Sequence, residues 1–550
     1  MTASMESHCI PYREIPHTAK LFTSFLGDFQ QVSNFYAHPP TAAGVDAAAR
    51  GVTLDPAIRK AVVEILRDQN QRFAPLGTLD PSTARNLERL ASGAVAIVTG
   101  QQVGLFSGPA YTIYKALSAV RCAEETTRRG LDAVPVFWLA SEDHDLAEVN
   151  HTFWNTRNGL ARYELPTEDS GRRVGEILLG DAIAPLVVEA TQTLEGPFAG
   201  EIANALRESY ASGETYSSAF GKLLARILAG RGMILIDQLD PRLHKLYAPG
   251  LRAAIQHADD CGHALLARAR ELESAGFHAQ VKVTHESTLV FSSASGPREP
   301  VRRKNGGFAT GGWELSVAQL LEKIERQPGQ FSPSALLRPV IQDSLLPTAA
   351  YIGGPAEVAY MAQAQVVYKT CGIRMPAILS RASFTAIEPP IARFLSQYEL
   401  NMRDFFAGPQ HLRAKMEQKS LPGALSAQFA ETEAALRSMM QRYEEPLTRL
   451  DSTLIEALRG SERKMLHQIE QLKGKVARAE NFRSGIIDRR ERILTDSLYP
   501  GGGLQERTLN FLPLLASQGP EFLDRLTALA SPALSAEGSV CANQHQVLSL

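Results

Sequence analysis

The sequence has few cysteines, and none of them forms a CxxC pair. The five stand singly and are odd in number: Cys9, Cys122, Cys261, Cys371 and Cys541. Isolated cysteines argue against a disulfide framework and are typical of proteins from a reducing compartment. None has sequence neighbours that would activate a thiolate, so we expect all five to be packing residues.

Long apolar runs and an excess of one charge are missing too. The strongest apolar runs, such as residues 134–140, are too short to span a bilayer. The first residues, MTASMESHCIPYREIP, lack the basic and apolar regions of a signal peptide. With 57 basic and 59 acidic residues, the formal net charge is -2, which argues against a broad nucleic-acid surface. We therefore expect a soluble cytoplasmic protein whose partners include neither membrane nor nucleic acid.

What is present is the composition of a globular protein. The chain has 550 residues, 44% of them hydrophobic and 21% charged, and is too long for one compact core. Between two apolar runs, Pro109 begins a helix with Ile113, Leu117 and Val120 on one face. A strand, helix and strand at this spacing predict a βαβ unit and an α/β fold. The predicted parallel strands are residues 94–98, 134–139, 232–237, 350–353 and 375–379.

Two long segments interrupt this strand–helix pattern. The first is mixed and polar. The second contains the alternating runs HAQVKV and TLVF and the turn-rich RRKNGG, which predict an antiparallel subdomain. The predicted division is a core of 1–151, 215–261 and 333–395, insertions at 152–214 and 262–332, a helical arm at 396–500, and a segment at 501–550 that returns to the core.

The arm has the hydrophobic spacing of a coiled coil. Apolar residues recur at intervals of three, four or seven, and charged residues fill the gaps. Pro446, the sequence Asp451-Ser-Thr or Gly460 could divide the arm into two antiparallel helices. The apolar seam predicts a homodimer held largely by the arm. The seam residues are Leu425, Phe429, Leu436, Met440, Tyr443, Leu447, Leu450, Leu454, Leu458, Met465, Ile469, Leu472 and Val476.

The first candidate site is the segment TGQQVGLFSGPAYTIYK (99–115), which joins a predicted strand to a predicted helix. Open α/β sheets bind ligands at the carboxyl ends of their strands. Gly108 lets the backbone approach a ligand, and the helix N-terminus offers N–H groups to an anion. Gln101 and Gln102 add neutral donors, while Tyr111 and Lys115 share one helical face. The segment is neither a GxGxxG fingerprint nor a Walker A loop, and a tight turn without a ligand is the alternative.

The second candidate site is SEDHDLAEVNH (141–151), which follows the strand that contains Trp138. A carboxylate beside an imidazole can orient the ring and raise its basicity, as acid–base chemistry requires. The alternative is the solvated start of an acidic helix. A zinc site made of His144, Asp145 and His151 is a weaker hypothesis, because the spacing matches no standard zinc pattern.

The third candidate site is YIGGPAEVAYM (351–361), where a strand ends at Gly353 and Gly354. Pro355 begins a helix there, so this turn is a second candidate for binding an anion or a carbonyl group. A Gly-Pro turn that only caps a helix explains the pattern equally well. Arg381 and Arg507 are further candidates for recognising carboxylate or phosphate, although single arginines more often form surface ion pairs.

These motifs closely resemble those of the bacillithiol biosynthesis cysteine-adding enzymes, a family of cysteine ligases. The residues that carry the resemblance are TGQQVGLFSGPAYTIYK (99–115), PVFWLASEDHDLAEVNH (135–151), YIGGPAEVAYMAQ (351–363) and GGGLQER (501–507). The resemblance covers essentially the whole chain. It implies a Rossmann-like core with two connecting-peptide insertions and a coiled coil that mediates dimerisation.

The resemblance also implies a reaction, the last step of bacillithiol biosynthesis. The carboxyl group of cysteine would be joined to the amine of glucosaminyl-malate by an amide bond. The core is similar to those of class I nucleotidyl transferases and cysteinyl-tRNA synthetases, so we expect ATP to activate cysteine as an adenylate, with Mg²⁺ as a candidate companion ion. The HIGH tetrad is replaced by GPAYTIYK at the same strand-to-helix position. SRASF (380–384) is at best a distant substitute for the missing KMSKS loop.

The ligase is therefore the favoured function, and two alternatives remain. In the ligase, His144 acts as the base or as a hydrogen-bond donor in the transition state, and Asp143 or Asp145 orients it or binds the amine. The first alternative is a nucleotide- or sugar-binding scaffold whose coiled coil recruits another enzyme. The second is an amide hydrolase that uses the histidine–carboxylate cluster. The predicted binding residues are Gln101, Gln102, Gly108, Tyr111, Lys115, Trp138, Gly353, Gly354, Arg381 and Arg507.

Overall fold

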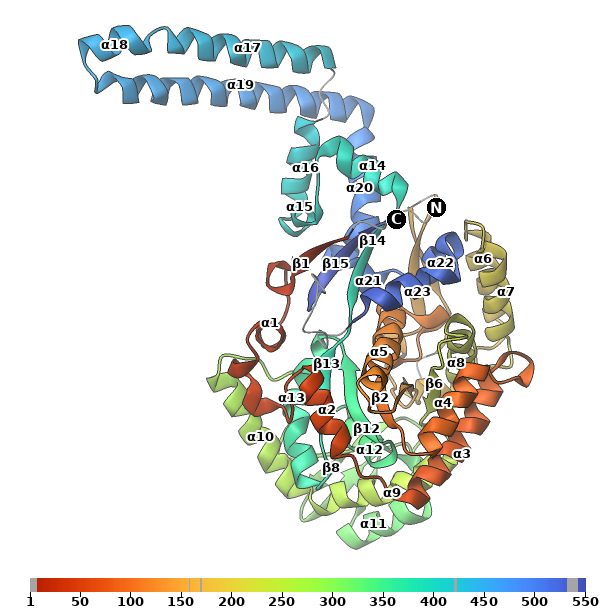
Figure 1. Ribbon diagram of the computed structural model, residues 1–550. Helices are drawn as coiled ribbons and strands as arrows, with labels where there is room; N and C mark the ends of the chain where they lie inside the picture. Colours follow the sequence, from red (N-terminus) through yellow and green to blue (C-terminus); the bar gives the residue numbers. More distant parts are fainter. Residues whose placement is uncertain (1–6, 158, 169–170, 420–422, 532–542) are drawn as a thin grey trace. The chain divides into compact units, whose positions relative to one another are not determined.

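Figure 1 shows the computed structural model, which describes residues 7–157, 159–168, 171–419, 423–531 and 543–550. The chain divides into two compact units. The larger contains residues 7–385 and 506–547, and the smaller contains residues 1–6, 386–505 and 548–550. None of the described helices has the length and apolar character needed to cross a membrane.

The larger unit is built on a five-stranded parallel sheet with the order β13-β12-β2-β3-β6. In the register, Val98 pairs with Val136 on one side and with Tyr351 on the other. All five strands were predicted from their apolar runs, although β2 continues past the predicted end to Gln102. The strands are β2 (Val95–Gln102), β3 (Ala133–Ala140), β6 (Ile234–Asp237), β12 (Thr348–Gly353) and β13 (Ala377–Ser380).

Helices cover this sheet because each has a wide apolar face. Helix α5 (Tyr111–Arg128) follows β2 and buries Ile113, Leu117 and Val120, as their spacing predicted. Helix α3 begins at Pro56, where the side chain of Asp55 accepts a hydrogen bond from the Ala57 amide. Other helices of this unit are α1 (Lys20–Gly27), α2 (Ala42–Arg50), α3 (Pro56–Phe73), α4 (Pro81–Ala91), α8 (Tyr216–Ile227), α9 (Pro241–Gln256), α10 (Ala258–Ser274), α12 (Arg338–Leu345), α13 (Pro355–Thr370), α22 (Leu512–Gln518) and α23 (Pro520–Leu529).

The two segments predicted as insertions have their own structure. The first contains the hairpin β4 (His151–Thr156) and β5 (Gly159–Glu164), followed by α6 (Ile183–Gln192) and α7 (Ala199–Ser209). The second forms an antiparallel sheet with the order β10-β9-β8-β7-β11, as predicted. Of the two alternating runs behind this prediction, TLVF lies in β7, but HAQVKV (278–283) forms no strand. Its elements are β7 (Ser287–Ser292), β8 (Glu299–Lys304), β9 (Gly307–Thr310), β10 (Trp313–Leu315), α11 (Val317–Arg326) and β11 (Phe331–Pro333).

A short strand near the start of the chain corrects one expectation about the cysteines. Strand β1 (Ser7–Pro11) is hydrogen-bonded to β15 (Gln544–Ser549), and β15 is hydrogen-bonded to β14 (Ser383–Ile387). Cys9 on β1 is disulfide-bonded. The prediction that every cysteine is an unpaired packing residue was therefore wrong for Cys9, because the spacing of isolated cysteines does not show whether one of them forms a disulfide. Cys122, Cys261 and Cys371 are free thiols.

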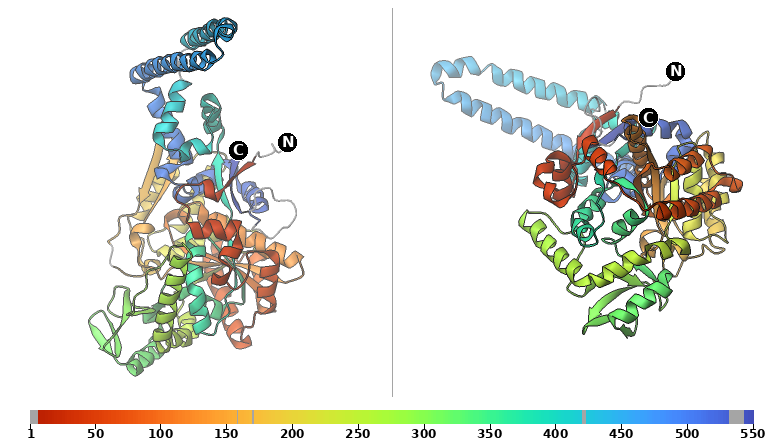
Figure 2. Two further views of the ribbon diagram at one scale, coloured as in Figure 1. Left: turned by 90° about the vertical axis from the view of Figure 1, so that its left-hand side faces the viewer. Right: turned by 60° about the horizontal axis from the view of Figure 1, so that its bottom comes forward.

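The smaller unit contains the predicted helical arm. Helices α17 (Gly423–Gln441) and α19 (Leu454–Ser484) lie antiparallel to each other (Figures 1 and 2), and Lys473 contacts Glu433 across them at 3.6 Å. The chain reverses after α18 (Glu444–Leu450), at Asp451-Ser-Thr, one of the three predicted turn positions. The other helices are α14 (Pro389–Tyr398), α15 (Met402–Phe406), α16 (Pro409–Gln418) and α20 (Ile486–Leu498).

The arm leaves much of its apolar seam exposed even after this pairing. Met440 is buried, but the seam residues Tyr443, Leu450 and Leu472 are 53%, 78% and 55% exposed. We expect a second copy of the chain to cover these side chains. Replacing Leu458 and Leu472 by glutamate should weaken the dimer, because burying a carboxylate in an apolar interface is costly. Static light scattering at micromolar concentration measures this, and Gln468→Glu on the same helix is the matched control. A wild-type protein that scatters as a monomer would contradict the prediction.

Candidate functional site

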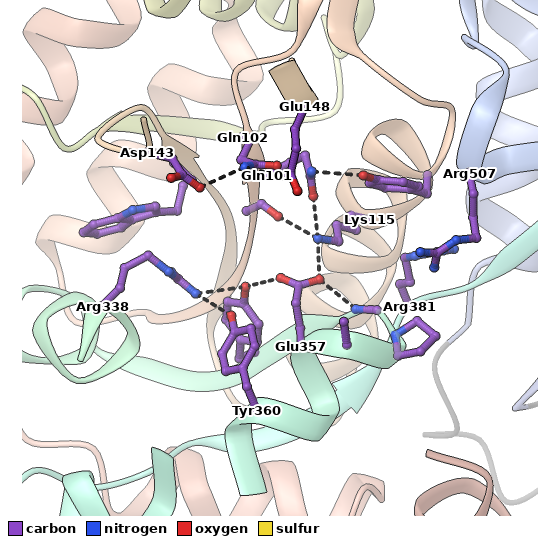
Figure 3. Close-up of a pocket in the computed structure, with 18 residues that line it drawn as sticks. Gln101, Gln102, Lys115, Asp143, Glu148, Arg338, Glu357, Tyr360, Arg381 and Arg507 are labelled. Carbon is purple, nitrogen blue, oxygen red and sulfur yellow. Dashed lines mark hydrogen bonds and ion pairs between the residues drawn. The ribbon is translucent and has the colours of Figure 1, made fainter. Parts of the chain in front are cut away.

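The larger unit has a polar cavity of about 380 Å³ at the carboxyl ends of β2, β3, β12 and β13. Its volume lies within the range of small-molecule sites, and its position is where open α/β sheets bind ligands. Figure 3 shows that side chains from all three predicted motifs meet there. The predicted residues that line this cavity are Gln101, Gln102, Tyr111, Lys115, Trp138, Asp143, Gly354, Arg381 and Arg507.

Four predicted residues lie outside the lining of this cavity. Gly353 pairs with Ser380 within the sheet. Gly108 lines a neighbouring cavity. His144 is half-buried in the same loop as Asp143, and Asp145 is exposed. The sequence places these residues near the strand ends, but the direction of each side chain depends on how the loop folds.

Lys115 lies in the floor of the cavity with all of its donors in use. The side chain is 3% exposed, and its ammonium donates to the Gly100 carbonyl at 2.9 Å and to Gln101 Oε1 at 2.8 Å. The third partner is the Glu357 carboxylate. Burial lowers the pKa of Lys115, and the Glu357 charge opposes this. Lys115 therefore fixes Gln101 and Glu357 in place, and a ligand would have to displace one of its partners to bind the ammonium directly.

A hydrogen-bonded network continues from Glu357 along α12 and α13. Tyr351 donates to Glu357 Oε1 at 2.6 Å, and Arg338 donates to Tyr360 at 2.9 Å and to Tyr351 at 3.3 Å. The Gly354 amide donates to Glu357 Oε2 at 2.8 Å. This amide is the group that the predicted anion site at the Gly-Pro turn requires. Since it already has a carboxylate acceptor, this turn serves to position Glu357.

Arg381 is held by a buried carboxylate. Its guanidinium donates to Glu506 at 2.7 Å and to the Ala382 carbonyl at 2.8 Å, and both charged side chains are almost fully buried. Glu506 also accepts from Ser383 Oγ at 2.8 Å. The Nε atom of Arg381 is buried and has no hydrogen-bond partner among the described residues. Arg507, next to Glu506 in the sequence, is exposed at the cavity.

Two carboxylates lie on another side of the cavity, joined by Gln102. Its amide nitrogen donates to Asp143 at 2.8 Å and to Glu148 at 2.9 Å. Burial would raise the pKa of Asp143, but hydrogen bonds from the His144 backbone amide and from Gln102, together with the Arg298 charge, hold it well below its usual range. Asp143 is therefore ionised at neutral pH.

His144 is oriented by an arginine from the second insertion. Arg298 donates to His144 Nδ1 at 3.1 Å, and its other nitrogens donate to Ser332 Oγ and to the Pro333 carbonyl, both at 2.9 Å. The guanidinium also lies 4.0 Å from the centroid of the Phe291 ring. Nδ1 also lies 3.4 Å from Asp143 Oδ1, a contact that would need a hydrogen on Nδ1. The Arg298 contact is the shorter of the two, and because Arg298 can only donate, Nδ1 accepts in it and the hydrogen of the neutral imidazole is on Nε2. This geometry favours His144 as a hydrogen-bond donor over a base.

A second cavity of about 410 Å³ adjoins the first and shares Gln101, Gln102, Tyr111, Glu148 and Arg507 with it. Gly108 and Thr112, at the start of α5, line it. The Thr112 hydroxyl is buried and has no hydrogen-bond partner within the described chain.

His151 also lines this second cavity. Burial, followed by the Arg162 charge, lowers the pKa of His151, so the ring is neutral at neutral pH and able to accept a proton.

A buried histidine behind Arg381 should make stability depend on pH. His545 contacts Ser383 Oγ at 2.7 Å and Thr385 Oγ1 at 2.9 Å. Burial lowers its pKa to about 4 from 6.5. As the pH falls from 7 to about 4, the unfolded chain gains a proton that the folded chain cannot take, so stability falls. This histidine should contribute about 3 kcal/mol of that loss.

The measurement is denaturant unfolding at several pH values between 7 and 4. His545→Asn should show a shallower decrease in the free energy of unfolding than the wild type, whereas the exposed control His257→Asn should show the wild-type decrease. Equal slopes for wild type and His545→Asn would show that His545 is not the group responsible.

Sequence reasoning missed several lining residues. Glu148, Tyr351, Glu357 and Tyr360 lie inside the three motifs, but none was selected, and Arg338 lies upstream of the third motif. Helical spacing could have selected Glu357, which is three residues after Gly354 in the position of a capping carboxylate. Arg298 lies in the second insertion, and no local pattern connects it to His144.

The parallel sheet, with a cavity at its strand ends, defines a protein with a Rossmann-like core. Residues 5–382 match the family described as "Bacillithiol biosynthesis BshC, N-terminal Rossmann-like domain", and residues 384–537 match "Bacillithiol biosynthesis BshC, C-terminal coiled-coil domain". The chain therefore belongs to the bacillithiol biosynthesis BshC family.

Three relatives, each named "Putative cysteine ligase BshC", show how far the similarity extends. The protein from Koribacter versatilis (strain Ellin345) is 39% identical, over 95% of this chain and 97% of its own length. The one from Solibacter usitatus (strain Ellin6076) is 38% identical with the same coverage of both chains. The one from Salinibacter ruber (strain DSM 13855 / M31) is 32% identical, over 94% of this chain and 96% of its own.

Proposed function

We propose that this protein is a cysteine ligase that joins the carboxyl group of cysteine to the amine of glucosaminyl-malate, forming the amide of bacillithiol. Family membership and the names of the relatives support a ligase of this pathway. The observation that carries the substrate assignment is the separation of charge in the cavity. Asp143 and Glu148 lie near Gln102 at one side, and Arg381 and Arg507 lie together at another (Figure 3).

The carboxylate side suits a substrate amine. Both substrates carry an amino group that is largely protonated near neutral pH, and an ionised Asp143 with Glu148 nearby would bind an ammonium. The attacking amine must lose a proton before the amide forms. His151, neutral and in the second cavity, is placed to accept it. His144, which the sequence favoured for catalysis, lines neither cavity but is next to Asp143, and its proposed role is to donate from Nε2 to oxygen charge that develops in the transition state.

The arginine side suits substrate carboxylates. Malate brings two carboxylates, and guanidinium groups recognise them with two parallel hydrogen bonds. The unpaired Nε of Arg381 and the exposed Arg507 both offer donors to the cavity. The unpaired hydroxyl of Thr112, at the N-terminus of α5, offers a further donor in the second cavity. Two adjoining cavities give room for two substrates that react with each other.

Amide formation in water requires an activated carboxyl group, and we propose ATP as its source. ATP, when bound, would supply the leaving group that cysteine lacks. The N-terminus of α5 with the unpaired Thr112 hydroxyl, in the second cavity, fits its phosphates, while Arg381 and Arg507 remain for malate. Mg²⁺ would accompany the phosphates. In the described part of the chain, no three histidine, cysteine or carboxylate side chains converge to hold a metal by themselves.

The direct test is to incubate the purified protein with cysteine, glucosaminyl-malate and ATP and to detect the product by mass spectrometry. A new species whose mass equals both substrates less one water, formed only with ATP, supports the ligase. Substrate binding without product supports a scaffold. Breakdown of supplied bacillithiol without any formation supports an amide hydrolase. Either of the last two outcomes would overturn the proposal.

The arginine side of the cavity has a separate test. Replacing Arg507 by methionine should raise the KM for glucosaminyl-malate, because a lost hydrogen bond to a charged group typically costs about 1.5–3 kcal/mol, or about tenfold or more in affinity. Arg525→Met, on α23, is the matched control, since Arg525 does not line either cavity. An unchanged KM in Arg507→Met would exclude this arginine from malate recognition.

A further inference from the structure

Two free cysteines from distant parts of the chain lie close to each other. Cys261 is in the first turn of α10, and Cys371 is the residue that ends α13. The two helices pack against each other, and each thiol is the neighbour that most alters the pKa of the other. Both thiols are free, so this is a pair of neighbouring reduced thiols. The usual Cα separation of a disulfide is about 5.5–6 Å, so neighbouring thiols on packed helices can be joined with a small movement.

The two thiols have different surroundings. Cys261 is 1% exposed, whereas Cys371 is partly exposed and is followed by the exposed Gly372. The neighbouring Cys261 thiol lowers the pKa of Cys371, while Cys371 and burial raise that of Cys261. A partly exposed thiol with a lowered pKa and a buried partner behind it is the arrangement of an attacking and a resolving cysteine.

The helices that carry the pair are already held together nearby. Arg268 of α10 donates to the Ala362 carbonyl of α13 at 2.5 Å and to Gln365 Oε1 at 2.7 Å. Arg268 is 5% exposed, so this contact is buried. Because these bonds fix α10 against α13, the two thiols stay close without any other rearrangement.

We propose that Cys261 and Cys371 form a redox-active thiol pair that reacts with a low-molecular-weight disulfide and closes to an intramolecular disulfide. In the first step, the Cys371 thiolate attacks one sulfur of the small disulfide. A mixed disulfide forms on Cys371, and one small thiolate leaves. In the second step, the Cys261 thiol loses its proton and attacks the Cys371 sulfur, and the second small thiol leaves. Two protein thiols are oxidised, and one small disulfide is reduced to two thiols.

The product would connect the two ends of a long chain segment and clamp α10 to α13. Helix α13 contains Glu357 and Tyr360 of the cavity in its first turns, and Cys371 ends the same helix. A cross-link here would restrict the unfolded chain and raise the melting temperature. The disulfide of a small thiol is the chemical class of oxidant that the pair would accept. The proposal stands on these contacts and does not depend on the ligase assignment.

The test uses the full-length protein and glutathione disulfide as the probe. After incubation, remaining thiols are blocked with N-ethylmaleimide, and the peptides are mapped without reduction. We expect a peptide pair linked through Cys261 and Cys371 to accumulate, with a higher melting temperature than the untreated protein. Cys261→Ser should instead retain a stable glutathione adduct on Cys371. Cys371→Ser should give neither product, and Cys122→Ser should behave like the wild type, because burial raises the pKa of that thiol to about 12.

The wild-type measurement tests the proposed disulfide formation by itself, even if a variant fails to fold. Full alkylation of both cysteines after long exposure to glutathione disulfide would overturn the proposal. So would a stable adduct on wild-type Cys371 without cross-linking, because the buried thiol would then not resolve it.

Discussion

Replacing His144 by alanine is expected to lower the rate of ligation about a hundredfold to ten-thousandfold, the usual contribution of a well-positioned acid–base group. The reason is the fixed donor geometry, in which Arg298 occupies Nδ1 and leaves the hydrogen on Nε2. The fold should be retained, because the ring is half-buried and lies in a loop. The measurement is the initial rate of product formation by mass spectrometry, with circular dichroism as the check on folding.

Two variants separate the chemical role of His144 from a structural one. His467→Ala, an exposed histidine on α19, should retain the wild-type rate. Arg298→Gln should change the pH dependence of the rate as well as its size, because the tautomer of His144 is then no longer fixed. A folded His144→Ala protein with near-normal turnover would show that His144 is structural. His151 would then be the remaining candidate for the catalytic histidine.

Replacing Arg381 by methionine should cause the largest loss of stability. Glu506 is 1% exposed and would be left as a buried charge without its partner. Removing one member of a buried ion pair typically costs about 3–5 kcal/mol. Folding stability, measured by denaturant unfolding at pH 7, should fall by that amount. Arg507→Met is the matched control, since Arg507 is exposed and its loss should change stability by no more than about 0.5 kcal/mol.

The double variant tests the physical reason for this loss. If the unpaired carboxylate is the cause, then Arg381→Met with Glu506→Gln should recover part of the lost stability, since glutamine can still accept the bond from Ser383. A double variant less stable than Arg381→Met alone would show that packing of the arginine, and not its charge, stabilises the site.

The sequence by itself determined the architecture of this protein. Its apolar runs are short and β-branched, and they are separated by helical patterns, so the five strands of the parallel sheet could be located within a few residues of their observed bounds. The alternating pattern of the second insertion and the spacing in the arm also have a local physical cause, because side chains alternate along a strand and recur every three to four residues on a helix. Because the strands are parallel, the motifs that follow them meet at one end of the sheet.

Only the tertiary structure decided what each side chain does there. Lys115 was selected as a ligand-binding residue, yet its ammonium is fully used by Gly100, Gln101 and Glu357. The orientation of His144 depends on Arg298, 154 residues further along the chain, and the proximity of Cys261 to Cys371 likewise involves distant segments. Periodicity reports only which face of an element is buried. Which donor meets which acceptor follows from how separate elements pack, and a linear pattern of residues contains no record of that.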